Sequence, residues 1–141
     1  MAERATILIP DISGYTDFLT KTELVYSSHI INELLEAILA ANSGEFVLSE
    51  VEGDALLLYH KGQPIEADAL VRQCLGMFES FHKHLKIVER DSICQCGACK
   101  TASNLTLKFI AHHGMVQEIK VMQFTRPDGR GDRGQERYRR R

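Results

Sequence analysis

Two aspartates, Asp11 and Asp54, stand where carboxylates could bind a divalent cation. Asp11 ends the apolar run "ATILIPD", and a turn of small residues leads from it into a helix-like segment. Asp54 follows Gly53 in "LSEVEGDALLLY" and separates two strand-like runs. Two ionised carboxylates at close range repel each other unless a cation lies between them, and Mg²⁺ or Mn²⁺ prefers such oxygen ligands. If folding brings the two residues together, they form a candidate metal site.

Each aspartate alone has a simpler interpretation. An aspartate after a strand commonly forms a turn or caps a helix, and Gly53-Asp54 is typical of a hairpin turn. The backbone N–H groups of residues 12–16, at a predicted helix start, favour an anion. A divalent cation beside a phosphate is the functional interpretation of the two segments taken together, and it depends on whether they meet.

Hydrophobic periodicity predicts the elements that would position these residues. In chain order we predict a strand at 6–10, a helix at 17–41, strands at 45–51 and 55–60, a helix that begins at 64, and strands at 105–112 and 118–124 around a turn at 113–115. The second helix should bury one face that includes Met77, Phe78 and Phe81.

This order of elements predicts an α+β fold of the ferredoxin-like βαββαβ type, an antiparallel sheet with flanking helices. In that motif the third strand returns between the first two and is antiparallel to both. The end of the first strand then lies beside the beginning of the third. We therefore expect Asp11 and Asp54 to converge on one rim of the sheet.

Composition fits one globular domain with a basic tail. The 141 residues contain no apolar run near the roughly 20 residues of a membrane span and no secretory leader pattern, so we expect a cytoplasmic protein without a membrane partner. Residues 1–125 hold 10 Lys and Arg against 16 acids, whereas residues 126–141 hold 7 Arg against 3 acids. We assign a domain to 1–125 and expect 126–141 to be a solvated, disordered tail or the product of a changed reading frame.

Cys94, Cys96 and Cys99 form a second candidate metal site. Their "CQCGAC" motif supplies three soft ligands, one short of a tetrahedral zinc site. The candidates for a fourth ligand are His112, His113, His82 or a cysteine of a second subunit. A redox pair, free thiols and an iron–sulfur cluster remain alternatives, whereas Cys74 is interpreted as a buried structural thiol.

Several segments resemble the class III adenylate and guanylate cyclases. "DISGYT" is similar to their Asp-(Ile/Val)-x-Gly-Phe-(Thr/Ser) signature, "EGDALLLY" to their Gly-Asp hairpin, and "LKFIAHHGMV" to their "LRIGIHTGPV" strand. The likeness covers residues 5–124 and implies a cyclase-type sandwich. The chain resembles still more closely a bacterial domain-of-unknown-function family of cyclase-homology proteins that carries a C-x-C-x-A-C insertion.

The resemblance implies that Asp11 and Asp54 are the catalytic ligands of Mg²⁺ or Mn²⁺, with the Ile12 carbonyl as a further ligand. Glu50 falls where cyclases read the base, and a carboxylate accepts hydrogen bonds from guanine; an ordinary exposed strand residue is the alternative. The substrate-binding turn would comprise Ser13, Gly14, Tyr15 and Thr16. Because cyclase sites form between two domains, the resemblance also implies a homodimer.

The C-terminal segment departs from the cyclase pattern. The family's later Asn and Arg, which neutralise phosphate charge, have no match in "RPDGRGDRGQERYRRR". We therefore predict a purine nucleoside triphosphate site that belongs to a nucleotidyl cyclase or to a relative that binds without turnover. The alternative is a non-catalytic, zinc-stabilised sensor or protein-interaction module. Arginine clusters favour phosphate, but without interleaved aromatic residues we expect no nucleic-acid partner.

Overall fold

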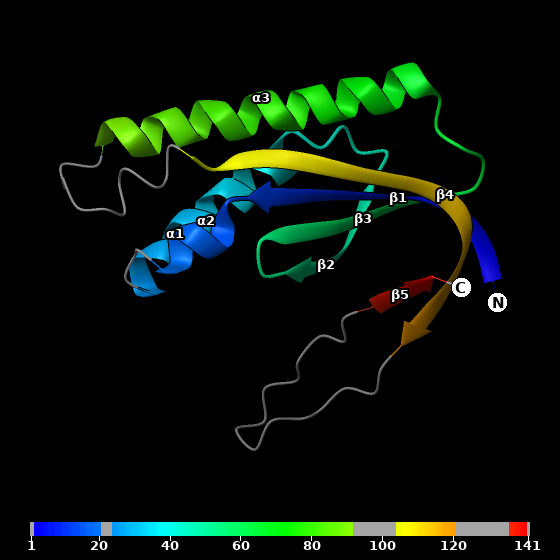
Figure 1. Ribbon diagram of the computed structural model, residues 1–141. Helices are drawn as coiled ribbons and strands as arrows, with labels where there is room; N and C mark the ends of the chain where they lie inside the picture. Colours follow the sequence, from blue (N-terminus) through cyan, green and yellow to red (C-terminus); the bar gives the residue numbers. More distant parts are fainter. Residues whose placement is uncertain (1, 21–23, 92–103, 121–135, 141) are drawn as a thin grey trace.

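The computed structural model describes residues 2–20, 24–91, 104–120 and 136–140 (Figure 1). The elements in these residues are β1 (Ala2–Ser13), α1 (Tyr15–Thr20), α2 (Leu24–Ala40), β2 (Val47–Glu52), β3 (Ala55–Lys61), α3 (Ala67–Asp91), β4 (Thr106–Lys120) and β5 (Glu136–Arg140). The strands form one antiparallel sheet in the order β2-β3-β1-β4-β5. The predicted α+β fold is confirmed, because β3 lies between β2 and β1 as the ferredoxin-like motif requires.

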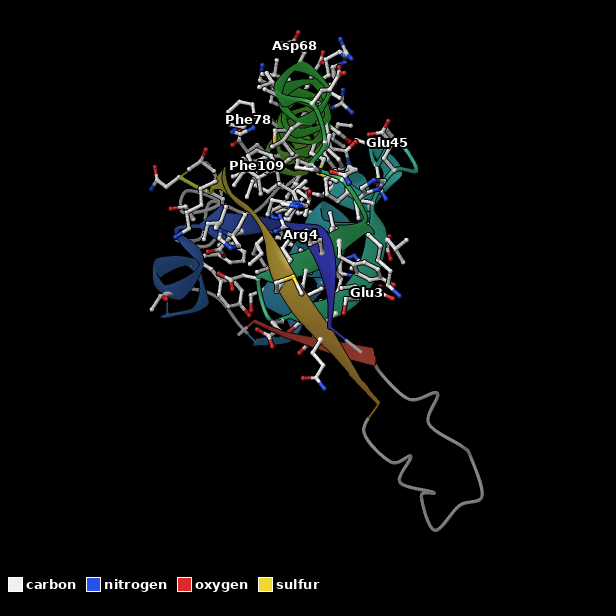
Figure 2. All side chains as sticks on the ribbon, turned by 90° about the vertical axis from the view of Figure 1, so that its right-hand side faces the viewer. Glu3, Arg4, Glu45, Asp68, Phe78 and Phe109 are labelled. Carbon is white, nitrogen blue, oxygen red and sulfur yellow. The ribbon has the colours of Figure 1, made fainter. Side chains whose placement is uncertain are left out.

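Alternate side chains of β1 lie on opposite faces of the sheet. Leu8 and Ile12 are buried in the main core with residues of all three helices, whereas Ala5 and Ile7 form a separate small cluster with Val116. This separation follows from the period of two along a strand. Figure 2 views the sheet from its end and shows α3 on one side of it, with Phe109 of β4 on the side that carries the main core.

The helices bury the stripes that their periodicity predicts. Met77, Phe81 and Leu85 of α3 are buried, and α3 packs against α2. Burial of a side chain of this size stabilises the folded state by roughly 2 kcal/mol. The residues of α2 that are buried in the same core are Ile30, Ile31, Leu34, Leu35 and Ile38. None of the helices in the described parts of the chain is long and apolar enough to span a membrane.

The prediction for one side chain of α3, Phe78, is wrong. Phe78 is 40% exposed and stacks on the ring of His82, with the ring centroids 4.1 Å apart. It lies outside the buried stripe of Met77, Phe81 and Leu85, and the ring of His82 on the same helix contacts its ring.

The predicted turn at residues 113–115 is also wrong, because β4 continues from Thr106 to Lys120. β1 is 12 residues long and pairs with β4 along its whole length, including Ala5 opposite Gly114. This ladder of backbone hydrogen bonds outweighs the tendency of a glycine to interrupt a strand. The predicted strand at 118–124 is described only to Lys120, where it belongs to β4.

Two other boundaries differ from the prediction. The segment predicted as one helix at 17–41 contains α1 and α2, and residues 21–23 between them lie outside the described residues. Residues 136–140 form β5, which pairs with residues 116–120 of β4. The solvated or frame-altered character predicted for the tail stays a prediction for residues 126–135, which also lie outside the description.

Candidate functional site

Backbone pairing brings the segments of Asp11 and Asp54 together at one rim of the sheet. Asp11 lies opposite Ala55 in the β1–β3 pair, and the N–H of Ile12 donates a 2.9 Å hydrogen bond to the carbonyl oxygen of Asp54. Gly53, with φ of +57°, begins the two-residue loop that turns β2 into β3. Such a loop needs a residue that tolerates positive φ at its first position. The structure therefore places the chain segments that carry the two aspartates side by side at one rim, as the topology predicts.

Asp11 is a strand residue and not a turn former or a helix cap. It lies within β1 and pairs with Ala55 on one side and Lys108 on the other. Its position along β1 places it on the same face as Ile7 and Ile9, away from the helices. The simpler local interpretation of this carboxylate is therefore wrong.

Lys108 was not among the residues predicted from the sequence, yet it completes the charge cluster. Its Nζ lies 3.3 Å from Oδ2 of Asp11, and the two side chains are 60% and 24% exposed respectively. A sequence signal for Lys108 exists: it is the second residue of "LKFIAHHGMV", and the similar cyclase strand "LRIGIHTGPV" also has a basic residue at that position. Two carboxylates and one ammonium group thus share this rim.

The pKa of Asp54 depends on its burial, on a backbone hydrogen bond and on the charges of Asp11 and Lys108. Burial is the largest influence and raises the pKa of the Asp54 carboxyl above its ordinary value. A hydrogen bond involving its own backbone lowers that pKa, the negative charge of Asp11 raises it, and the positive charge of Lys108 lowers it. Because the raising effects win, the ionised form of Asp54 is less stable here than in water. An additional cation at this rim would relieve that cost.

The turn after β1 lies at the surface beside these residues. Gly14 has φ of +91°, and its carbonyl oxygen accepts a 3.1 Å hydrogen bond from the N–H of Phe18 in α1. A Cβ at this position would lie 3.2 Å from the carbonyl oxygen of Asn104, so a glycine permits this close approach. Thr16 is exposed and Ser13 is half-buried, whereas Tyr15 packs against the main core.

Glu50 is a buried residue, so the interpretation as an exposed strand residue is wrong. It is 9% exposed and lies opposite Leu57 in the β2–β3 pair, next to a register shift between Leu48 and Glu50. Leu57 packs against the small cluster on the face turned away from the helices. Because paired residues share a face, Glu50 lies on the same side of the sheet as Asp11.

The predicted zinc site falls mostly outside the described residues, since Cys94, Cys96 and Cys99 all lie in 92–103. His112 is exposed on β4, and Nδ1 of His113 lies 3.0 Å from Oγ1 of Thr6. Among the residues that the structure describes, no group of three or more His, Cys, Asp or Glu could hold a metal ion. The zinc site stays a prediction.

His82, another candidate for the fourth zinc ligand, and Cys74, predicted to be a structural thiol, both contact other residues of the fold. Nδ1 of His82 lies 2.9 Å from the carbonyl oxygen of Phe78, and its Nε2 lies 3.4 Å from Oγ1 of Thr106. Cys74 is half-buried against the main core, and burial raises the pKa of its thiol. A raised pKa keeps the thiol protonated and unreactive at neutral pH.

Sequence comparison relates the chain to two sets of proteins. The family model described as "Protein of unknown function (DUF2652)" matches residues 31–131. The uncharacterized protein Rv2561/Rv2562 of Mycobacterium tuberculosis is 33% identical over 89 residues, which make up 63% of this chain and 41% of that protein. The chain thus spans less than half the length of this curated relative.

Solved structures share the fold. A bacterial light-regulated adenylyl cyclase superposes with a TM-score of 0.65 at 13% identity, over 98% of this chain and 36% of that chain. The guanylate cyclase domain of RhGC from Catenaria anguillulae, in complex with GTP, superposes with a TM-score of 0.59 at 17% identity, over 86% of this chain and 63% of that chain. The fold is that of class III adenylyl and guanylyl cyclase domains, and the predicted resemblance is confirmed at this level.

Proposed function

The chain belongs to the DUF2652 family, and we propose that it binds a purine nucleoside triphosphate through a divalent cation held by Asp11 and Asp54. The observation that carries the proposal is the pairing of β1 with β3, which sets the two carboxylates at one rim of a cyclase-type sheet. Burial and the charge of Asp11 both raise the pKa of Asp54, so the cluster gains from a cation.

Mg²⁺ or Mn²⁺ suits these residues. Both ions prefer oxygen ligands, and Mg²⁺ is usually bound by one or two carboxylates together with substrate phosphates and water. Asp11 and Asp54 would hold the ion, and the main-chain carbonyl of Ile12 is the further ligand implied by the cyclase resemblance. When bound, the ion would neutralise negative charge on the triphosphate.

Glu50 supports a preference for guanine. Its carboxylate lies on the face of the sheet that carries Asp11 and is largely withdrawn from water. A buried carboxylate accepts hydrogen bonds from the N1–H and 2-amino groups of guanine, whereas adenine lacks these two donors in that arrangement. We therefore propose GTP as the tighter ligand, with Ser13, Gly14 and Thr16 at the phosphate end.

A second copy of the chain is part of the proposal. Val47 of β2 and Ile110 of β4 are exposed on the same face as Asp11, and Ile110 is 47% exposed. Apolar side chains beside a polar site favour association with another protein surface. A homodimer would place this face against its equivalent, in line with the arrangement implied by the cyclase resemblance.

The test is calorimetric titration of GTP and ATP in Mn²⁺ against the wild type, Asp11→Asn and Asp54→Asn. Glu52→Gln is the matched control, because Glu52 is an exposed acid on the same hairpin. We expect both aspartate variants to lose about tenfold or more in affinity, which equals ~1.4 kcal/mol, and the control to bind like the wild type. Wild-type protein that binds neither nucleotide, or aspartate variants that bind normally, would refute the proposal.

A further inference from the structure

Lys108 forms an ion pair unlike the other lysine pairs of the described residues. Lys83 and Glu79 are both well exposed neighbours one turn apart on α3, and Lys61 and Glu3 lie 3.6 Å apart at the surface. Lys108 is itself 60% exposed, but its partner Asp11 is only 24% exposed, and the charge of Lys108 also acts on a second carboxylate, that of Asp54. It therefore belongs to the aspartate cluster, where its charge lies close enough to Asp11 to act on any ion bound there.

We propose that Lys108 is a built-in counter-cation of the two aspartates, which opposes a bare divalent ion and makes the site take up the ion and the triphosphate together. This inference rests on the proposed function, because it concerns the same cation. In addition to binding both ligands, the site would bind the ion and the nucleotide cooperatively, and Lys108 would couple the two.

The charges of the cluster carry the argument. With both carboxylates ionised, the ammonium group of Lys108 leaves the trio with one net negative charge. A divalent ion would change that to one net positive charge and would lie close to the ammonium group, which repels it. A triphosphate brings several negative charges, which remove the excess. The bare ion is thus disfavoured and the ion with its triphosphate is favoured.

A purely structural ion pair predicts something different. Exposed lysine–carboxylate pairs contribute little to stability, and the loss of one does not alter how strongly a distant ligand changes the affinity for a metal. The distinguishing quantity is the ratio of the Mn²⁺ dissociation constants without and with GTP. By thermodynamic linkage the same ratio describes the effect of Mn²⁺ on GTP binding.

The experiment measures free Mn²⁺ by electron paramagnetic resonance during titration of the protein at low ionic strength, with and without GTP. The variants are Lys108→Gln, Lys108→Arg and the control Lys83→Gln, whose lysine pairs with Glu79 on α3. We expect Lys108→Gln to bind Mn²⁺ alone about three to ten times more tightly than the wild type and to lose most of the coupling to GTP. The arginine variant and the control should keep the wild-type ratio, and 0.5 M salt should shrink the difference.

The two hypotheses fail in different ways. If the wild type binds Mn²⁺ with GTP, and Lys108→Gln binds Mn²⁺ alone no more tightly than the wild type, the role of Lys108 is refuted while the nucleotide site stands. If the wild type binds neither Mn²⁺ nor GTP, both are refuted. Bare Mn²⁺ binding that is detectable only after removal of the lysine would support the inference.

Discussion

Replacing Asp54 by asparagine should stabilise the fold at neutral pH. Because burial and Asp11 raise the pKa of Asp54 above its unfolded value, the folded state holds this proton more tightly. The stability of the wild type therefore falls as the pH rises through the window above about 4, and at pH 7 the cost of the ionised carboxyl is fully present. Asparagine removes the charge and keeps an oxygen that can accept the backbone hydrogen bond.

The size of the effect is limited by the position of Asp54 at the surface. Two like charges 4 Å apart in water-like surroundings repel by about 1 kcal/mol, and the neighbouring Lys108 offsets part of this. We expect Asp54→Asn to gain roughly 0.5 kcal/mol at pH 7, which corresponds to a rise in Tm of about 1 to 2 °C for a domain of this size.

Scanning calorimetry of the wild type, Asp54→Asn and the control Glu52→Gln at several pH values tests this reasoning. The advantage of Asp54→Asn should be full near pH 7 and should vanish near pH 4, whereas the control should follow the wild type. Added Mn²⁺ should raise the Tm of the wild type more than that of Asp54→Asn, because ligands stabilise the state that binds them. An Asp54→Asn protein that is less stable than the wild type at pH 7 would show that this carboxylate is a structural residue.

Two further substitutions test contacts that stabilise the fold. Gly14→Ala should lower the free energy of unfolding by about 1 to 2 kcal/mol, and by more than Gly53→Ala does. A Cβ on Gly14 would lie 3.2 Å from the carbonyl oxygen of Asn104, whereas one on Gly53 meets nothing within 4 Å. Equal urea midpoints for the two variants would contradict this. Gln73→Ala should lower the free energy of unfolding by about 1 to 2 kcal/mol, because buried Gln73 donates a 2.8 Å hydrogen bond from α3 to Oδ1 of Asn42, in the loop after α2. An unchanged urea midpoint would show that this hydrogen bond contributes nothing to stability.

The position of the aspartate pair was predictable because it follows from topology. Apolar periodicity identified β1, the β2–β3 hairpin and two amphipathic stripes, and the handedness of the crossover leaves one place for β3. Asp11 and Asp54 then had to meet, although they lie far apart in the sequence. Their roles as ligands remain predictions.

The features that could not be predicted depend on tertiary contacts. Lys108 matches a basic residue of the cyclase strand, but its contact with Asp11 follows only from the register of β4 against β1. The continuity of β4 through Gly114 depends on a long neighbouring strand, which no property of residues 113–115 reveals. Glu50 is buried because of its position in the sheet, whereas a charged residue type predicts an exposed side chain.

The alternation along β1 links the proposed cation site to the packing of the interior. Leu8 and Ile12 fill the space under the helices, while Asp11 points to the opposite face of the same strand. A slip of one position would exchange the two faces, turning the carboxylate inward and the leucine outward. Substitutions deep in the molecule that loosen this strand should therefore weaken ion binding even when every charged group is left in place.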